Sequence, residues 1–227
     1  MSKRIRIAID GPGGAGKSTV AKIIATDLGV DYVDTGAMYR AVAYKMQENG
    51  IDIKNQSGID KMLSDTEIDF SDGDIILDGK IVNDFIRTPE ISKLASDCSA
   101  LASVREKLVA LQREMGSKKS IVMDGRDITT NVLPDAEFKF YMTASKEERA
   151  KRRYDELLAK GKETSYEEVL SDIETRDHND MTRKLNPLKK ADDATELDTT
   201  EMTIEEVCGF IKSTVRGDIR GDTHGNG

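Results

Sequence analysis

The sequence predicts an α/β fold in which a parallel sheet forms the core and a small antiparallel sheet is inserted into it. Near the N-terminus, an alternating apolar strand, a glycine-rich loop, a helical pattern and a second strand follow one another over residues 5–34. This order is typical of parallel sheets flanked by helices. Two Asp-Gly turns then separate short β-rich runs between residues 68 and 82, which indicates an antiparallel meander. Strand and helix patterns alternate again after residue 120.

The first strand and helix have the clearest pattern. Isoleucine alternates with other residues over positions 5–9, and apolar residues recur at helical spacing from Lys17 to Leu28, followed by Gly29 as a stop. A short strand over residues 31–34 comes next, and then a second helix over about residues 37–47. This segment therefore predicts the start of a parallel sheet.

The pattern changes between about residues 54 and 87, which contain the two Asp-Gly turns. We interpret this segment as an insertion into the α/β framework. Thr88 and Pro89 predict the start of a helix, with Thr as N-cap and Pro in the first turn. Ser103 and Glu106 have the spacing of a capping box and predict the start of another helix.

The C-terminal half continues the alternation of strands and helices. Apolar strands are expected at residues 120–123, 138–142 and 196–198, and Ser145, Ser165 and Thr203 each precede a Glu by three residues, as in capping boxes. The polar linker over residues 159–164 is expected to be mobile. From Gly217 onward the chain has little to bury, so we expect a disordered tail over residues 217–227.

The composition excludes several classes of protein. With 34 Lys and Arg against 42 Asp and Glu, the net charge of −8 argues against a nucleic-acid partner bound by general phosphate attraction. We expect no membrane association, because no run approaches the roughly 18 apolar residues of a spanning helix. The N-terminus lacks signal-peptide anatomy, so a cytoplasmic location is expected. Two cysteines and two histidines favour buried thiols over a zinc site, and nothing demands an oligomer, so we expect a monomer.

The strongest motif is a phosphate-binding loop. Residues 11–18 fit G-x-x-x-x-G-K-[ST] after a strand and at the start of a helix, which predicts a P-loop NTPase-type core. Backbone N–H groups of such a loop face an anion, Lys17 can reach the β- and γ-phosphates, and the Ser18 hydroxyl can ligate Mg²⁺. The candidate ATP-binding residues are Gly11, Pro12, Gly13, Gly14, Ala15, Gly16, Lys17, Ser18 and Thr19.

Further candidates for phosphate chemistry stand in three places. Tyr39 and Arg40 follow the second strand, where they either hold an acceptor phosphate or form an ordinary helix surface. Asp124 ends an apolar strand in the manner of a Walker-B carboxylate. The basic segment over residues 148–153 is either a solvated helix face or a set of arginines that close over the site as a lid.

These motifs together resemble the cytidylate kinase family over about nine-tenths of the chain. The matching segments are residues 10–19 (DGPGGAGKST), 34–40 (DTGAMYR), 86–88 (IRT), 104–106 (VRE), 124–127 (DGRD), 148–153 (ERAKRR) and 176–180, with Arg183, 187–188 and 193–194. Gly13 stands where the family usually has Ser. The resemblance implies that the insertion is a monophosphate-binding domain and that the basic segment belongs to a helical lid.

The resemblance also implies domain boundaries. The core would comprise residues 1–34, 106–147 and 187–216, the monophosphate-binding insertion residues 35–105, and the lid residues 148–186. The predicted tail completes the chain. The loop over residues 187–194 would flank the adenine of ATP.

Residue roles follow from the same resemblance. Ser96, Arg105 and Asp127 would read the cytosine, whereas Arg176 and Asp180 would contact the pentose. The acceptor phosphate would be held by Tyr39, Arg40, Arg126 and Arg183, and Thr35 is a further substrate-binding candidate. The catalytic candidates are Lys17, Arg149, Arg152 and Arg153. Mg²⁺ would be ligated by Ser18, with Asp34 or Asp124 as candidates that act through water; Asp34 acting as a base is the other hypothesis.

The implied activity is transfer of the γ-phosphoryl group of ATP to CMP or dCMP, with Mg²⁺ as cofactor and ATP and CMP or dCMP as partners. The nearest alternative is another P-loop small-molecule or nucleotide kinase with a different acceptor. A second alternative is a nucleotide-dependent switch or an RNA-associated module. The absence of the guanine-reading string Asn-Lys-x-Asp and the net acidity count against this switch.

Overall fold

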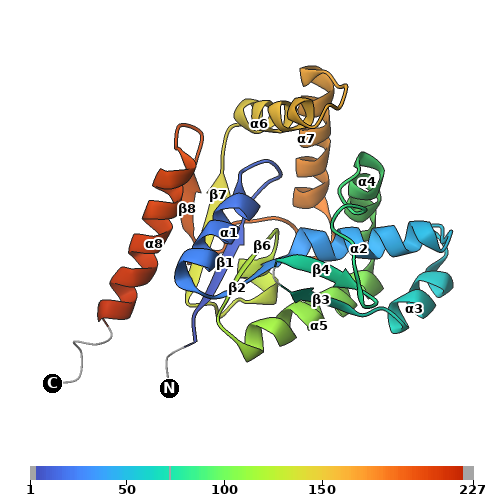
Figure 1. The fold of residues 1–227 in the computed structure, drawn as a ribbon, viewed down its shortest axis with the longest axis horizontal. Helices are drawn as coiled ribbons and strands as arrows, with labels where there is room; N and C mark the ends of the chain where they lie inside the picture. Colours follow the sequence, from blue (N-terminus) through green and yellow to red (C-terminus); the bar gives the residue numbers. More distant parts are fainter. Residues whose placement is uncertain (1–3, 72, 222–227) are drawn as a thin grey trace.

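The computed structural model describes residues 4–71 and 73–221. Its main sheet has five strands in the order β2-β6-β1-β7-β8, and every neighbouring pair is parallel. These strands are β1 (Arg6–Asp10), β2 (Asp31–Asp34), β6 (Ile121–Gly125), β7 (Phe138–Thr143) and β8 (Thr195–Asp198). The predicted parallel core is confirmed, and all of its strands end at the same edge (Figure 1).

The register of the central strands brings their carboxyl ends together. Asp10 at the end of β1 pairs with Gly125 of β6, and Asp34 at the end of β2 pairs with Asp124. Each strand then continues into a loop or helix that carries candidate site residues. Loops at the carboxyl edge of a parallel sheet are the usual place for ligands in such folds.

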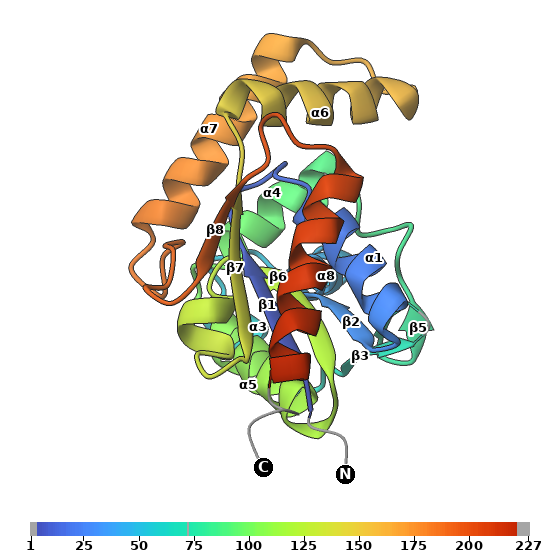
Figure 2. The same ribbon diagram turned by 90° about the vertical axis from the view of Figure 1, so that its left-hand side faces the viewer.

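Helices cover both faces of this sheet. On one face α1 (Lys17–Leu28) and α8 (Ile204–Gly221) pack against Ile7, Ile9 and Phe140, and Figure 2 shows α8 in front of the sheet. The other face buries Ala8, Ile121 and Met123 against α2 (Thr35–Glu48) and α5 (Ala102–Lys118). The sheet is therefore the middle layer of an α/β/α arrangement.

The insertion forms the second, antiparallel sheet that the sequence predicts. It comprises β3 (Ile68–Ser71), β4 (Asp74–Leu77) and β5 (Lys80–Ile81), in the order β3-β4-β5. Ile68 pairs with Leu77, and Ile76 pairs with Ile81. Together with α3 (Gln56–Ser64) and α4 (Pro89–Cys98), the sheet surrounds α2 (Figure 1). Buried residues of the insertion belong to the same hydrophobic cluster as the sheet residue Ala8, so the insertion shares its core with the main sheet.

A pair of helices, α6 (Lys146–Ala159) and α7 (Tyr166–Thr182), stands beyond the carboxyl edge of the sheet (Figures 1 and 2). The two helices pack on each other through a small separate cluster that includes Ala150, Val169 and Ile173. Because their apolar contacts are made mainly to each other, the pair is a distinct packing unit. A short helical turn of the π type, η1 (Ile128–Val132), follows β6 at the same edge.

The predicted helix starts are confirmed in all but one case. The side chains of Thr88, Ser145 and Ser165 cap α4, α6 and α7, and the Thr203 hydroxyl accepts a hydrogen bond from Glu206 N at the start of α8. The capping box predicted at Ser103 is wrong. A tight turn after α4 leads directly into α5, which begins at Ala102 with Leu101 as its N-cap and without a side-chain cap.

The predicted disordered tail is also wrong in part, because α8 continues to Gly221. Buried Val207, Ile211 and Val215 fix this helix on the sheet, and extending a formed helix is much easier than nucleating one. The rest of the predicted tail, residues 222–227, lies outside the described residues. Cys98 and Cys208 are buried free thiols, as expected. Among the described helices, none has the length and apolar character required to cross a membrane.

Candidate active site

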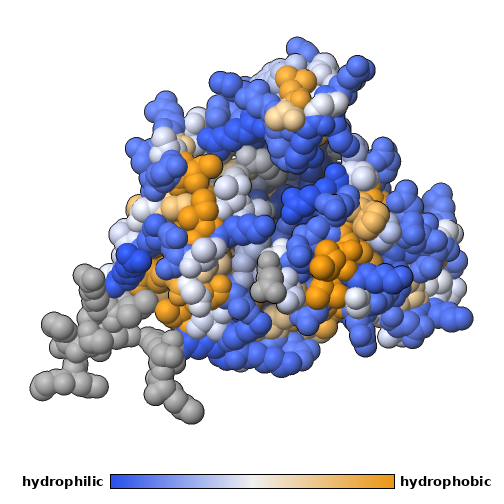
Figure 3. Space-filling view, viewed as in Figure 1, coloured by the Kyte–Doolittle hydropathy of each residue, from blue (hydrophilic) through white to orange (hydrophobic). Residues whose placement is uncertain are grey.

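A cleft of ≈ 330 Å³ lies at the carboxyl edge of the main sheet, between the phosphate loop, the insertion and the helix pair α6–α7. Figure 3 shows it as a recess bordered by hydrophilic residues below the helix pair. Most of the predicted site residues line it: Gly13, Gly14, Gly16, Lys17, Ser18, Thr19, Thr35, Tyr39, Arg40, Ser96, Arg126, Asp127, Arg153, Arg176, Asp180 and Arg183, with the candidate carboxylates Asp34 and Asp124. The predicted residues that are not part of the lining are Gly11, Pro12, Ala15, Arg105, Arg149 and Arg152.

The phosphate loop has the backbone that its glycines predict. Gly11, Gly14 and Gly16 have positive φ angles of 149°, 77° and 83°, a region that other residues rarely adopt. A Cβ atom on Gly11 would overlap the carbonyl oxygen of Met142 in β7. Glycine is therefore required at position 11 both for its conformation and for its close approach to the neighbouring strand.

Lys17 is the first residue of α1, at the end of the phosphate loop, and is almost fully buried. Its ammonium group donates a 2.7 Å hydrogen bond to the carbonyl of Pro12. Burial and the positive charge of Arg126 lower the pKa of Lys17 to about 7. A buried cation with so few partners is suited to an anionic ligand, because nearby negative charge favours its protonated form.

Beside Lys17, the carboxylate of Asp124 binds a hydroxyl group at each oxygen. Ser18 Oγ donates to Oδ2 at 2.8 Å, and the Tyr32 hydroxyl donates to Oδ1 at 2.8 Å. Burial, together with the neighbouring Asp34 carboxylate, raises the pKa of Asp124 to about 6. Two carboxylates and a hydroxyl therefore stand next to the phosphate loop.

The donor set fits Mg²⁺ better than a transition metal. Within residues 4–71 and 73–221, no group of three or more His, Cys, Asp or Glu side chains is arranged to hold a metal. Mg²⁺ needs no such cage, because it prefers oxygen ligands and is usually bound by one or two carboxylates together with substrate phosphates. Ser18, Asp124 and Asp34 supply oxygens of this kind.

Asp34 and Arg40 connect the end of β2 with the acceptor side of the cleft. Asp34 Oδ1 accepts from Ala37 N at 2.8 Å and so caps α2, while Oδ2 accepts from Arg40 Nη2 at 3.0 Å. Arg87 Nη2 lies 3.7 Å from the same oxygen. Two arginines therefore converge on one carboxylate that lines the cleft. Thr35 instead donates to the carbonyl of Asp124 at 2.7 Å, a contact that joins α2 to β6.

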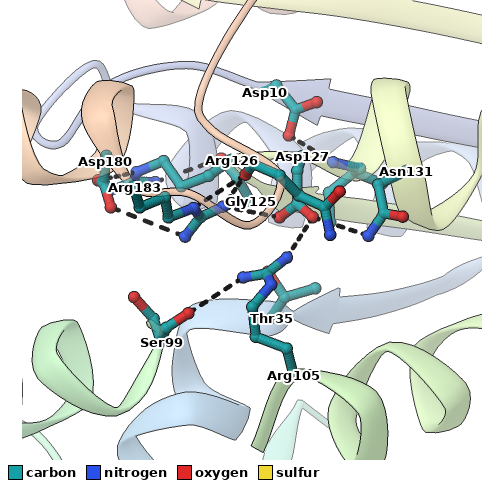
Figure 4. Close-up of polar contacts among 12 residues, drawn as sticks. Asp10, Thr35, Ser99, Arg105, Gly125, Arg126, Asp127, Asn131, Asp180 and Arg183 are labelled. Atoms are coloured by element: carbon teal, nitrogen blue, oxygen red, sulfur yellow. Dashed lines mark hydrogen bonds and ion pairs between the residues drawn. The ribbon is translucent and has the colours of Figure 1, made fainter. Parts of the chain in front are cut away.

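Elsewhere in the cleft, the carboxylate of Asp127 accepts hydrogen bonds from two arginines and an asparagine amide (Figure 4). Arg105 donates to Oδ2, Asn131 Nδ2 donates to the same oxygen at 3.0 Å, and Arg183 Nη2 donates to Oδ1 at 3.1 Å. Arg105 also lies over the ring of Tyr39, at 5.9 Å from its centroid, and burial raises the pKa of Tyr39 to about 12. Asp127 is thus a buried carboxylate held by several donors.

Arg126 and Asp180 form a second ion pair at the same edge, with 2.7 Å between Arg126 Nε and Asp180 Oδ2 (Figure 4). Burial acts to raise the pKa of Asp180, but the charge and hydrogen bond of Arg126 outweigh it, so the pKa lies below its ordinary value. This pair connects the residue that follows β6 to α7. The acceptor side of the cleft therefore depends on the helix pair for part of its lining.

Three buried polar atoms in the described part of the chain have no hydrogen-bond partner: Arg40 Nε, Arg105 Nε and Asp177 Oδ1. Arg40 and Asp177 line the cleft, and Arg105 binds Asp127, which also lines it. Buried polar groups are rarely left unpaired. Their concentration around one cleft indicates that a polar ligand completes the site.

The three predicted lid arginines differ in where they point. Arg149 reaches back to the phosphate loop, donating to Gly13 O at 2.9 Å and pairing with Asp177 Oδ2 at 2.7 Å. Arg153 lines the cleft and pairs with Glu156. Arg152 is not among the residues that line the cleft, since its guanidinium donates to Thr199 O at 2.8 Å and to Glu148 Oε1 at 2.9 Å.

Sequence reasoning missed several residues of this site. Arg87, Asp177, Lys160 and Lys162 line the cleft, but single charged residues in loops and on helices give no distinctive signal. Tyr32 and Asn131 were missed for different reasons. Tyr32 binds Asp124, which is 92 residues away in the sequence. Asn131 binds Asp127 from a helical turn that was not predicted. Arg87 and Asp177 did lie in segments that carried the resemblance, residues 86–88 and 176–180, but neither had an assigned role.

Comparisons with known proteins agree with this geometry. The cytidylate kinase family model matches residues 7–216. A cytidylate kinase from Clostridioides difficile (strain 630) is 49% identical over 209 residues, covering 92% of this chain and 97% of the relative. One from Carboxydothermus hydrogenoformans is 52% identical over 207 residues, covering 89% of this chain and 93% of the relative.

Among solved structures, a gluconokinase from Sinorhizobium meliloti 1021 aligns with a TM-score of 0.51 and 12% identity, covering 98% of this chain and all of that chain (100%). At this identity the match concerns the fold alone, and it agrees with the five-stranded parallel sheet covered by helices that is seen here. The sequence relatives and the family model carry the more specific conclusion: the chain belongs to the cytidylate kinase family.

Proposed function

We propose that the protein transfers the γ-phosphoryl group of ATP to CMP or dCMP, giving ADP and CDP or dCDP. One observation carries this proposal: a single cleft joins the phosphate loop around Lys17 to the acceptor-side carboxylate Asp127 and its arginines. The two halves follow neighbouring strands, β1 and β6. A donor and an acceptor bound there would meet at the carboxyl edge of the sheet, which is the arrangement that phosphoryl transfer between two nucleotides requires.

The acceptor phosphate is assigned to three arginines that line the cleft, Arg40, Arg126 and Arg183, together with Tyr39. Charge-assisted hydrogen bonds from guanidinium groups to phosphate are among the strongest in proteins. The unpaired Arg40 Nε supports this role. Arg87 joins the set, because it lines the same cleft and its Nη2 lies 3.7 Å from Asp34 Oδ2, the oxygen that binds Arg40.

The cytosine is assigned to Arg105, Asp127 and Ser96. A carboxylate accepts hydrogen bonds and cannot donate them, so Asp127 favours the exocyclic amine of cytosine over the carbonyl of uracil. The free Nε of buried Arg105 supplies a donor for the acceptor edge of the ring. A site that leaves buried groups unpaired discriminates strongly against the wrong base. Arg176 and Asp180, which also line the cleft, are assigned to the pentose.

The donor side uses Lys17 and the loop N–H groups to hold the β- and γ-phosphates. Ser18 would ligate Mg²⁺, with Asp124 and Asp34 acting through water. When bound, Mg²⁺ would neutralise charge on the phosphate oxygens. Arg149 and Arg153 lie near enough to the loop or the cleft to stabilise the charge of the transferring group. Arg152 is assigned to the same step after a rotation of its side chain away from Thr199, since it does not line the cleft here.

Three further assignments stay predictions of the sequence. These are the domain boundaries 35–105 and 148–186, the cytoplasmic location and the monomeric state. The separate packing of α6 against α7 supports treating this pair as a lid. The core that the insertion shares with the sheet limits how far the insertion can move without repacking.

A coupled assay of ADP release tests the proposal. The protein is supplied with ATP and Mg²⁺ and challenged separately with CMP, dCMP, UMP, AMP, GMP and dTMP. We expect strong turnover with CMP and dCMP alone. Arg105→Met should lower kcat/KM for CMP by about 100-fold or more, whereas Lys107→Met on the same helix should leave it unchanged. Activity with a different acceptor would overturn the cytosine assignment, and the absence of any acceptor-stimulated turnover would overturn the kinase assignment.

A further inference from the structure

The side chain of Asn131, in the helical turn η1, contacts the carboxylate of Asp127, which lies four residues earlier in the chain (Figure 4). The Asn131 side chain is half-buried and donates through Nδ2 to Asp127 Oδ2 at 3.0 Å. No helix was predicted for residues 128–132, where this turn lies. Residue 131 has no role in the activity proposed above, so this contact calls for a separate explanation.

Neighbouring groups fix the direction of the Asn131 amide. Arg113 on α5 donates through Nη2 to Asn131 O at 2.7 Å and to Asn131 Oδ1 at 3.3 Å. An arginine is a donor and never an acceptor. Oδ1 therefore faces Arg113, and the NH₂ group of Asn131 faces Asp127.

The donors around Asp127 occupy its two oxygens unequally. Oδ2 accepts from both Arg105 and Asn131, which fills its two lone-pair positions. Oδ1 accepts from Arg183 and retains one position. The carboxylate is thereby held with a single open acceptor position, on the oxygen that Asn131 does not contact.

The turn that carries Asn131 is itself anchored. Buried Asp10 accepts from Ile128 N at 2.9 Å, from Thr129 N at 2.7 Å and from the Thr129 hydroxyl at 2.6 Å. Asn131 and Val132 also donate their N–H groups to the carbonyl of Asp127. Because both ends of η1 are fixed in this way, the Asn131 side chain has little freedom to leave Asp127.

We propose that Asn131 is a positioning residue for base specificity: its amide occupies Asp127 Oδ2 so that the open position on Oδ1 meets the exocyclic amine of cytosine. The proposal rests on the assignment of Asp127 to the cytosine in the activity proposed above. Without Asn131, Oδ2 would regain an open position and the carboxylate would turn more freely. The preference for CMP, whose base carries an amine, over UMP, whose base carries a carbonyl at the same place, would then decrease.

The test measures kcat and KM for CMP and for UMP at saturating ATP and Mg²⁺ in the parent, Asn131→Leu, Asn131→Asp and Thr130→Val. Asn131→Leu removes the donor and keeps the approximate size of the side chain. We expect the ratio of kcat/KM for CMP to that for UMP to fall roughly tenfold, mainly through a higher KM for CMP. The KM for ATP should stay as in the parent, because the phosphate loop is untouched.

Asn131→Asp is the second variant because it keeps the size of the residue while placing one carboxylate against another. Like charges in contact repel, so its ratio should fall at least as far as that of Asn131→Leu, and it remains informative if the leucine variant does not fold. Thr130→Val removes a hydroxyl from the same turn without touching Asp127 and should keep the parent ratio and thermal midpoint.

The outcomes separate the two proposals. If the parent itself does not prefer CMP to UMP, the cytosine assignment fails. A parent that prefers CMP, with folded Asn131 variants that keep the same ratio, overturns the role of Asn131 alone. Equal losses for CMP and UMP, or a loss of the same size in Thr130→Val, would also overturn it, because they would reflect general disruption of the turn.

Discussion

Ser18 Oγ lies 2.8 Å from Asp124 Oδ2 and donates to it, which joins the first turn of α1 to the end of β6. Tyr32 holds the other oxygen of the same carboxylate at 2.8 Å. The Asp124 side chain is thus oriented from two sides, one of them a strand at the edge of the sheet. A carboxylate fixed in this way is ready to bind a water of a hydrated cation without first reorganising.

Removing the Tyr32 hydroxyl should therefore weaken the use of Mg²⁺ more than the binding of nucleotides. For Tyr32→Phe we expect the Mg²⁺ concentration that gives half-maximal rate to rise by about tenfold, with the KM for CMP close to that of the parent. Titration of the rate with Mg²⁺ at fixed ATP measures this, and titration with Mn²⁺ provides a comparison. A half-maximal concentration identical to that of the parent would show that Tyr32 does not orient Asp124 for the metal.

Substitutions of two glycines in the phosphate loop, Gly11 and Gly13, should lower stability by very different amounts. Gly11→Ala places a Cβ atom against the carbonyl of Met142 at a φ of 149°, so we expect a loss of about 3 kcal/mol or more in the free energy of unfolding. Gly13→Ala meets only Arg126 Nη2 at 3.6 Å and should change the free energy of unfolding by less than about 1 kcal/mol. Urea denaturation of both variants gives the comparison, and equal losses would contradict it.

Asp10 should make stability depend on pH in a direction opposite to most carboxylates. Burial, opposed by hydrogen bonds from Thr129 and Ile128, raises its pKa above 3.8 in the folded state. Immediately above pH 3.8 the folded chain therefore retains a proton that the unfolded chain releases, and the contribution of this group to stability falls as the pH rises through its folded pKa. Asn at this position cannot titrate.

We accordingly expect the difference in thermal midpoint between the parent and Asp10→Asn to shift in favour of Asp10→Asn as the pH rises from about 4 to about 7. The loss of an acceptor for Thr129 or Ile128 adds a constant offset that does not change with pH. Thermal scans at matched ionic strength measure the difference. A difference that is constant over this range, or that shifts in favour of the parent, would show that the pKa of Asp10 is not raised.

Arg149 should be essential for turnover and nearly irrelevant for acceptor binding. It contacts Gly13 O and Asp177 on the donor side, so Arg149→Lys, which lacks the planar fork of donors, should lower kcat by about 100-fold. The KM for CMP should change little. Lys151→Met, two residues further along α6 and exposed, is the matched control and should retain parent activity. A rise in the KM for CMP without a fall in kcat would contradict this division of roles.

Sequence patterns predicted the features that depend on interactions between residues close together in the chain, such as helix N-caps, strands and turns. Ser145 and Ser165 bond to backbone groups three residues away, and the two sheets follow from strand patterns and turns. The failure at Ser103 shows the limit of such signals, because the turn after α4 had already set the start of α5 at Ala102. Likewise, the apolar face of α8 carried the helix past Gly217, beyond where composition alone suggested an end.

Contacts over long separations were the part that no local pattern could reveal. The orientation of Arg152 depends on Thr199, which is 47 residues away, and Asp10 binds the N–H of Ile128, 118 residues away. The phosphate loop was recognisable because its chemistry is contained in residues 11–18. The base-reading side was not recognisable in the same way, because Arg105, Asp127 and Arg183 meet only after the chain has folded, and their roles came from resemblance.

The two contacts of Arg149 restrict how the helix pair α6–α7 can move relative to the phosphate loop. Its guanidinium spans Gly13 in the phosphate loop and Asp177 in α7, while its backbone lies in the first turn of α6. A rotation of the helix pair relative to the phosphate loop would have to break either the bond to Gly13 or the bond to Asp177. The start of the helix pair is thus bonded directly to the phosphate loop, so a movement of this loop on binding ATP would reach α7 through the single guanidinium of Arg149.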